Sequence, residues 1–111
     1  MMEIIDRAVL DSLSNAVGDE FVGELIDTFI EEGPGMFNEM QQALSVADAD
    51  SFRRAAHSLK TNAATFGAKV LAEKAKELEA MARENNLEIG NRFENLEDSY
   101  WQAVQALKEL T

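Results

Sequence analysis

The sequence contains no cysteine, a single histidine and a single proline. Without cysteine the chain has no disulfide framework, thiolate metal site or cysteine nucleophile. One histidine also excludes any site that needs two imidazole groups, which removes much of enzyme chemistry. One proline and six glycines in 111 residues argue against a loop-rich or fibrous chain.

Long apolar runs and an apolar signal segment are missing as well. The N-terminal stretch carries Glu3, Asp6, Arg7 and Asp11, and no segment approaches the roughly 20 apolar residues of a membrane span. We therefore expect a cytoplasmic protein that does not bind membranes. The length and the 46% hydrophobic content predict a single domain over residues 1–111 with one core, and we expect a monomer.

Basic residues are scarce, with 10 Lys and Arg against 21 Asp and Glu and a net charge of −11. This charge repels DNA, RNA and anionic lipids, so nucleic acid is not an expected partner. The basic residues are unevenly distributed, and many lie between residues 51 and 76. That window contains Arg53, Arg54, Lys60, Lys69, Lys74 and Lys76, with Glu73 as its only acidic residue. The single histidine, His57, lies in the same basic window.

Apolar residues recur at spacings of three and four along most of the chain, which predicts an all-α fold. We expect an up-down antiparallel four-helix bundle with an additional short N-terminal helix, because short connections favour antiparallel neighbours. The first helix is predicted from about residue 4 to 17, and the second begins at Asp19. Pro34 either kinks one long helix or starts a second stretch. The third helix begins after Asp48 or Asp50 and ends at Gly67.

His57 is predicted to face outward from the third helix. On a helical wheel centred on Leu59 it lies about 160° from the apolar face, beside Arg54, Thr61 and Ala64. Arg53 and Lys60 flank it, and the small side chains of Thr61 and Ala64 leave the imidazole accessible. A lone exposed histidine is usually an ordinary surface residue. The combination of exposure with nearby cations is what favours a function.

This combination suits a neutral imidazole nitrogen that attacks a phosphoryl donor and carries the group as a phosphoramidate. Histidine changes charge between about pH 5 and 8, so the nucleophile is present near neutral pH without an activating base. The product adds about two negative charges, which Lys60, one turn away, is placed to stabilise. A turn at Gly67 would bring Glu79 beside His57, where it could orient the ring by accepting its proton. An ordinary solvated glutamate is an equally open interpretation.

The segment at residues 55–68, AAHSLKTNAATFGA, resembles the signature around the active histidine of histidine-containing phosphotransfer (HPt) domains. The resemblance continues through GDEFVGELIDTFIEE and LAEKAKELE. It implies that His57 is phosphorylated, that Lys60 stabilises the phosphoryl group and that Gly67 forms the turn between two helices. Thr61 and Asn62 depart from the glycine and serine that are usual in the family. The extra bulk of Thr61 on the docking face is expected to narrow the choice of partner or to slow transfer.

The resemblance also implies the partners, which are receiver domains of response regulators and hybrid histidine kinases. Arg53, Arg54, Thr61 and Ala64 are the expected docking residues. The magnesium ion that assists transfer belongs to the receiver domain, so no cofactor or metal is expected here. No segment forms a phosphate loop with its Lys and Ser/Thr, and we therefore expect a phosphocarrier without kinase activity rather than an enzyme.

Two other functions compete with the phosphocarrier interpretation. A carboxylate-bridged metal bundle needs Glu-x-x-His pairs from two helices, whereas this chain has one histidine with Arg54 in the glutamate position. Met36, Met40, Tyr100 and Trp101 are expected to be packing residues rather than ligands. The stronger alternative is an acidic adaptor that binds a signalling partner without being phosphorylated. The presence of both His57 and Lys60 favours the phosphocarrier.

Overall fold

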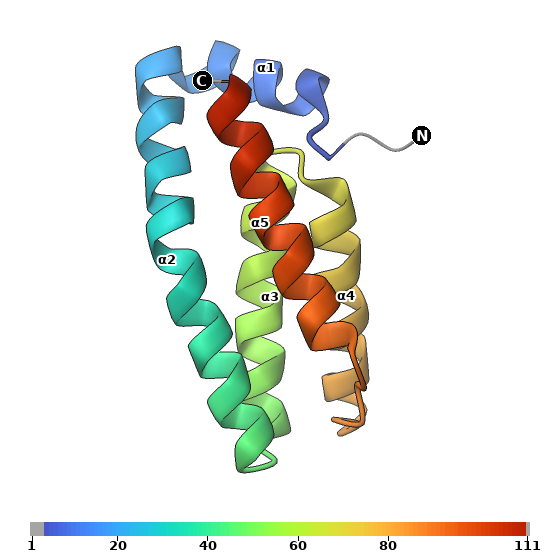
Figure 1. Cartoon of the computed structure of the whole chain (residues 1–111). Helices are drawn as coiled ribbons and strands as arrows, with labels where there is room; N and C mark the ends of the chain where they lie inside the picture. Colours follow the sequence, from blue (N-terminus) through green and yellow to red (C-terminus); the bar gives the residue numbers. More distant parts are fainter. Residues whose placement is uncertain (1–3, 111) are drawn as a thin grey trace.

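The computed structural model describes residues 4–110, and its secondary structure in this range is entirely helical. The helices are α1 (Arg7–Val17), α2 (Asp19–Ser45), α3 (Ala49–Thr65), α4 (Lys69–Arg83) and α5 (Arg92–Leu110). Helices α2 to α5 form an antiparallel bundle, and α1 lies across one end of it (Figure 1). The predicted all-α architecture is therefore confirmed.

The helix ends follow from local capping. The Asp6 side chain accepts a hydrogen bond from the Ala8 N–H at 3.0 Å, so α1 begins at Arg7, three residues later than the apolar spacing suggested. Asp48 is the residue that caps α3, and it accepts a hydrogen bond from the Ser51 N–H at 3.1 Å. Of the two predicted candidates for this cap, Asp48 is thus the correct one.

The core lies along the bundle axis and is built from the inward faces of all five helices. Its largest fully buried side chains are Tyr100, Phe52, Met40, Leu59, Leu71, Leu78, Leu96 and Leu107. Phe21 of α2, although large and apolar, is 48% exposed. It lies about 140° around the helix from the buried Ile26, so it cannot reach the same core. Within residues 4–110, no helix is long and apolar enough to cross a membrane.

Helices α3 and α4 form the most extensive helix pair in the bundle. Both bury small side chains, which lets two helices approach closely: Ala55, Ala56, Ala63, Ala75 and Ala82. The turn between them needs Gly67, whose φ is +77° and where a Cβ atom would collide with the Asp6 carbonyl oxygen.

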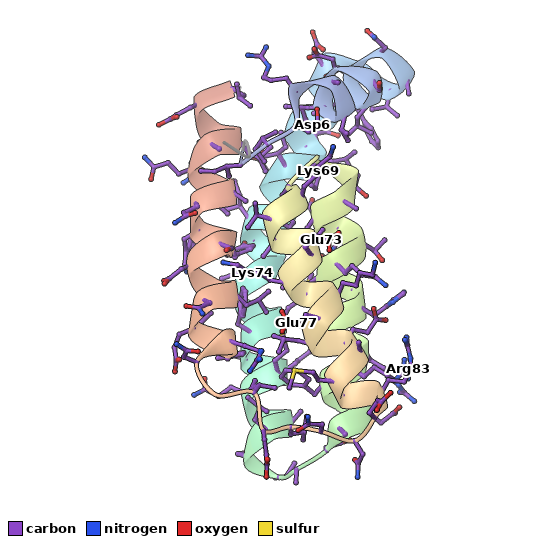
Figure 2. The ribbon with its side chains drawn as sticks, turned by 90° about the vertical axis from the view of Figure 1, so that its right-hand side faces the viewer. Asp6, Lys69, Glu73, Lys74, Glu77 and Arg83 are labelled. Carbon is purple, nitrogen blue, oxygen red and sulfur yellow. The ribbon has the colours of Figure 1, made fainter. Side chains whose placement is uncertain are left out.

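The segment before α1 holds this turn in place. The Asp6 N–H donates to the Gly67 carbonyl oxygen at 2.8 Å. The Asp6 carboxylate pairs with Lys69 Nζ at 2.6 Å, at the start of α4 (Figure 2). The N-terminal segment therefore helps to set the position of α4 against α3.

Helix α2 continues through Gly33, Pro34 and Gly35, so it is one long helix rather than two. Pro34 has no N–H, which leaves the Ile30 carbonyl without its normal helical donor. Tyr100 of α5 occupies this break, with its hydroxyl oxygen 3.1 Å from the Ile30 carbonyl oxygen and 2.9 Å from that of Phe29. Burial raises the pKa of Tyr100 to about 12, so the hydroxyl keeps the proton that it donates.

Tyr100 can come this close because residue 33 is glycine. A Cβ atom at Gly33 would overlap the hydroxyl and the ring of Tyr100. The ring is fully buried and also contacts Phe29 and Phe37, with centroid distances of 5.2 Å to each. It therefore has no free space into which it could turn.

We expect Gly33→Ala to lower the free energy of unfolding by about 1–3 kcal/mol, because the new methyl group overpacks the buried ring. Gly35→Ala is the matched control, since a Cβ atom there meets nothing within 4 Å. It should raise the free energy of unfolding by about 0.4–1 kcal/mol through the reduced entropy of the unfolded chain. Urea unfolding followed by circular dichroism measures both. The same response from the two variants would contradict the packing account of Gly33.

Candidate functional site

The structure brings His57, Lys60 and Glu79 together at the surface between α3 and α4. The His57 side chain is 56% exposed and therefore faces outward, as the helical wheel predicted. Its Nδ1 atom lies 2.6 Å from Oε2 of Glu79, and Lys60 Nζ donates to Oε1 of the same carboxylate at 2.6 Å. Two α3 side chains thus share one α4 carboxylate.

Glu79 is buried, with only 3% of its side chain exposed, so it is not a solvated helix glutamate. Burial alone would raise the pKa of its carboxyl group. The hydrogen bonds and charges of Lys60 and His57 outweigh burial and hold the pKa below its ordinary value of 4.5. The carboxylate is therefore ionised at neutral pH.

The ionised state of Glu79 fixes where the imidazole carries its proton. An ionised carboxylate can only accept hydrogen bonds, so the hydrogen of the bond between His57 and Glu79 belongs to Nδ1. In the neutral ring the lone pair is then on Nε2, the nitrogen that does not contact Glu79. This arrangement presents a nucleophilic nitrogen on a half-exposed side chain.

Arg83 is a further cation beside Glu79 that the sequence analysis did not identify. Its guanidinium nitrogen lies 3.4 Å from Oε2 of Glu79, one helical turn along α4, near the end of the helix (Figure 2). Oppositely charged residues four apart on a helix are neighbours, so the spacing of Glu79 and Arg83 could have indicated this contact from the sequence. With Lys60 and Arg83, permanent cations outnumber the carboxylate, so the cluster favours an added anionic group.

This cluster does not resemble a metal site. Across residues 4–110, no group of three or more His, Cys, Asp or Glu side chains is placed to hold a metal ion. The residues around Glu79 instead combine one carboxylate with several cations, which suits an anion such as a phosphoryl group.

A cleft of about 590 Å³ lies beside His57, between α2 and α3. Its α3 wall is formed by Ser51, Arg54, Ala55, His57, Ser58, Thr61 and Asn62. Of the predicted docking residues, Arg54 and Thr61 line this cleft, whereas Arg53 and Ala64 do not. Arg53 pairs with Asp50 at 3.0 Å, and Ala64 is exposed outside the cleft.

The opposite wall of the cleft comes from α2, and sequence analysis missed it. Glu32, Met36 and Glu39 form this wall. Their spacing of four and three residues places them on one face of a helix. This spacing could not be interpreted from the sequence, because Pro34 lies between Glu32 and Met36. It was therefore not known whether the residues belong to one continuous helix.

Comparison with known proteins identifies relatives of this chain. The sequence model of the Hpt domain family matches residues 24–110. The phosphorelay protein LuxU of Vibrio cholerae is 32% identical, over 90% of this chain and 93% of its own length. LuxU of Vibrio harveyi is 26% identical, over 78% of this chain and 75% of its own. The crystal structure of histidine-containing phosphotransfer protein B (HptB) from Pseudomonas aeruginosa is similar with a TM-score of 0.86 at 30% identity, over 98% of this chain and 95% of that chain.

The chain therefore belongs to the Hpt domain family. Proteins of this family are phosphocarriers that hold the phosphoryl group on a histidine, and they are not kinases. The resemblance found in residues 55–68 is confirmed, and the helical bundle predicted from the apolar spacing matches the fold of HptB.

The pH dependence of stability tests the ionised state of Glu79. The folded-state pKa of its carboxyl lies below 4.5, so on acidification the unfolded chain takes up the proton first. The stability that Glu79 contributes is then complete above about pH 5 and is lost as the pH falls through the folded-state pKa. We expect the free energies of unfolding of wild type and Glu79→Gln to converge between about pH 5 and pH 3.

Urea titrations at several pH values measure this convergence. Asp6 and Asp48 also have lowered pKa values, through hydrogen bonds from Lys69 and Ser51 respectively, but both residues are present in the two proteins and cancel in the difference. A difference that stays constant over the whole range would show that folding does not lower the pKa of the Glu79 carboxyl group.

Proposed function

We propose that this protein is a histidine phosphocarrier in a two-component phosphorelay and that His57 is the phosphorylated residue. Receiver domains would donate the phosphoryl group to His57 and accept it from His57. The observation that carries the proposal is the half-exposed imidazole whose Nδ1–H is bonded to the buried, ionised Glu79. Membership of the Hpt domain family and the similarity to phosphorelay proteins support the same function.

The proposed step begins with attack of the Nε2 lone pair on the phosphorus of an aspartyl phosphate. A P–N bond forms, the P–O bond to the aspartate breaks, and the aspartate leaves as a carboxylate. The ring becomes positively charged while Nδ1 keeps its proton, which stays bonded to Glu79. The carboxylate of Glu79 therefore both orients the ring and stabilises this positive charge. Transfer to the next receiver is the reverse reaction with a different aspartate.

Lys60 is the proposed stabiliser of the phosphoryl oxygens. An ammonium group has three N–H donors, and its bond to Glu79 leaves others available. Arg83 adds a second cation, 3.4 Å from Oε2, the carboxylate oxygen that His57 also contacts. Contacts between such cations and phosphoryl oxygens are charge-assisted hydrogen bonds, which are stronger than neutral ones.

Receiver domains are proposed to dock on the α3 surface around His57, with Arg53, Arg54, Thr61 and Ala64 in the contact area. The magnesium ion that assists transfer is expected on the receiver, and this chain is proposed to act as a monomer without nucleotide chemistry of its own.

A phosphorylated receiver domain should transfer its phosphoryl group to this protein. The product should be labile in acid and stable in alkali, as expected of a nitrogen-linked phosphate. His57→Gln should abolish labelling and leave the helical circular dichroism unchanged, because an exposed side chain contributes little to packing. Labelling that persists in His57→Gln would refute the assignment. Receiver binding without any labelling of the wild type would favour the acidic adaptor.

Glu79→Ala should lower the transfer rate several-fold between about pH 6 and 8, because the ring loses the acceptor that fixes its orientation and tautomer. In ¹⁵N NMR spectra of the neutral ring, the variant should shift from the Nδ1–H towards the Nε2–H form. Glu79→Gln should restore part of the rate, since its amide oxygen can accept from Nδ1. Glu73→Ala, which removes an exposed carboxylate of the same helix, is the control. A wild-type rate and tautomer in Glu79→Ala would show that His57 acts without this partner.

A further inference from the structure

The two walls of the cleft beside His57 differ in charge. The α3 wall contains the cation Arg54 beside His57, whereas the α2 wall contributes the acidic residues Glu32 and Glu39. Helix α2 has no Lys or Arg in its 27 residues. Its acidic residues are Asp19, Glu20, Glu24, Asp27, Glu31, Glu32 and Glu39. The negative charge of the α2 wall is therefore not offset by any cation on its own helix.

The charges of the two walls do not neutralise each other across the cleft. Arg54 pairs with Asp50 of its own helix at 2.9 Å. In the part of the chain that the structure describes, neither Glu32 nor Glu39 forms an ion pair. Both side chains are exposed, so a cation from another molecule can reach them.

Met36 lies between these two glutamates and is half-buried. The α2 wall thus has an apolar centre with a charged residue on either side along the helix. Protein interfaces commonly combine an apolar centre with a polar rim, and methionine adapts well to the shape of a partner. Part of Met36 packs against the core, and the part that remains exposed gives the cleft wall an apolar centre that a partner can contact.

This geometry restricts the partner, given the proposed phosphotransfer function. The reacting group of a receiver is an anionic aspartyl phosphate, and it must approach His57 on the α3 wall. If the part of the receiver that faces the α2 wall were also acidic, Glu32 and Glu39 would repel it. A receiver with a Lys or Arg at that point would be attracted and would associate faster.

We infer that Glu32 and Glu39 select receiver domains that present a basic side chain to the α2 wall of the cleft, a conclusion that rests on the proposed function. These glutamates act on the choice of partner and not on the chemistry at His57. These glutamates lie at the rim of the contact and act electrostatically. They therefore change the rate at which the receiver associates, and this effect weakens as the salt concentration rises.

The test compares Glu32→Lys/Glu39→Lys with Glu24→Lys/Asp27→Lys. The second pair is exposed on the same helix, lies outside the cleft and changes the net charge equally. Transfer from a panel of phosphorylated receiver domains is measured at low and high salt. Each rate is divided by the rate at which phosphoramidate, a small donor without a docking surface, labels the same variant.

For the receiver that is fastest with wild type, the cleft pair should lower the normalised rate about three- to tenfold at low salt, and the control pair less than about twofold. The loss should shrink at about 0.5 M salt, where screening is strong. Glu32→Gln/Glu39→Gln should give an intermediate loss. In that receiver, replacing single Lys or Arg residues near the phosphorylated aspartate by Glu should yield one change that slows wild type and restores the cleft variant.

Equal losses for the cleft and control pairs would overturn the inference, because they would show a general effect of net charge. Failure of every receiver substitution to restore the cleft variant would overturn it as well. Failure of phosphoramidate to label His57 in wild type is a different result, since it would refute the proposed function itself.

Discussion

The buried carboxylate of Glu79 can remain ionised only while both of its oxygens receive hydrogen bonds from donors on α3. A buried charge without such partners costs several kcal/mol, roughly, so the protein must keep α3 and α4 in the register that supplies them. That register depends on the turn at Gly67, which the segment around Asp6 holds in place. The orientation of an exposed imidazole is therefore tied, through one carboxylate, to packing at the end of the bundle where α1 lies (Figure 1).

A second constraint concerns the α2 side of the cleft. Pro34 lies between Glu32 and Met36 in the sequence, so α2 loses a backbone hydrogen bond in the turn of helix that carries these two cleft residues. The Tyr100 hydroxyl satisfies the carbonyl that Pro34 leaves open and fastens α2 to α5 there. This bond from α5 compensates for the missing hydrogen bond, so α2 continues through Pro34. Glu32 and Glu39 therefore both project from one continuous helix.

Much of the fold could be predicted from sequence because it depends on local rules. The apolar spacing identified the helices, the helical wheel placed His57 on the outside, and capping chemistry limited the start of α3 to Asp48 or Asp50. The burial of Glu79 could not be predicted in this way, because it depends on how closely α3 and α4 approach. From the sequence alone, Glu79 is therefore compatible both with a partner of His57 and with a solvated residue.

The remaining differences have similar causes. Arg53 and Ala64 share the outer face with His57 but lie outside the cleft, since a wheel gives direction around one helix and no information on its neighbour. The α2 wall was missed because the effect of Pro34 depends on a tyrosine that is far away in the sequence. Local sequence patterns were thus sufficient to place the imidazole of His57. The walls of the cleft beside it could be identified only from the three-dimensional structure.

The contact between Gly33 and Tyr100 also limits how this sequence can diverge. A larger residue at position 33 is compatible only with a smaller one at position 100, because the two occupy the same space. Replacing Tyr100 by a residue without a hydroxyl removes the donor from the Ile30 carbonyl, which then favours a residue with an N–H in place of Pro34. The residues at these positions are consequently coupled: Gly33, Pro34 and Tyr100. In sequences descended from this one, substitution of one of the three should be accompanied by substitution of the others.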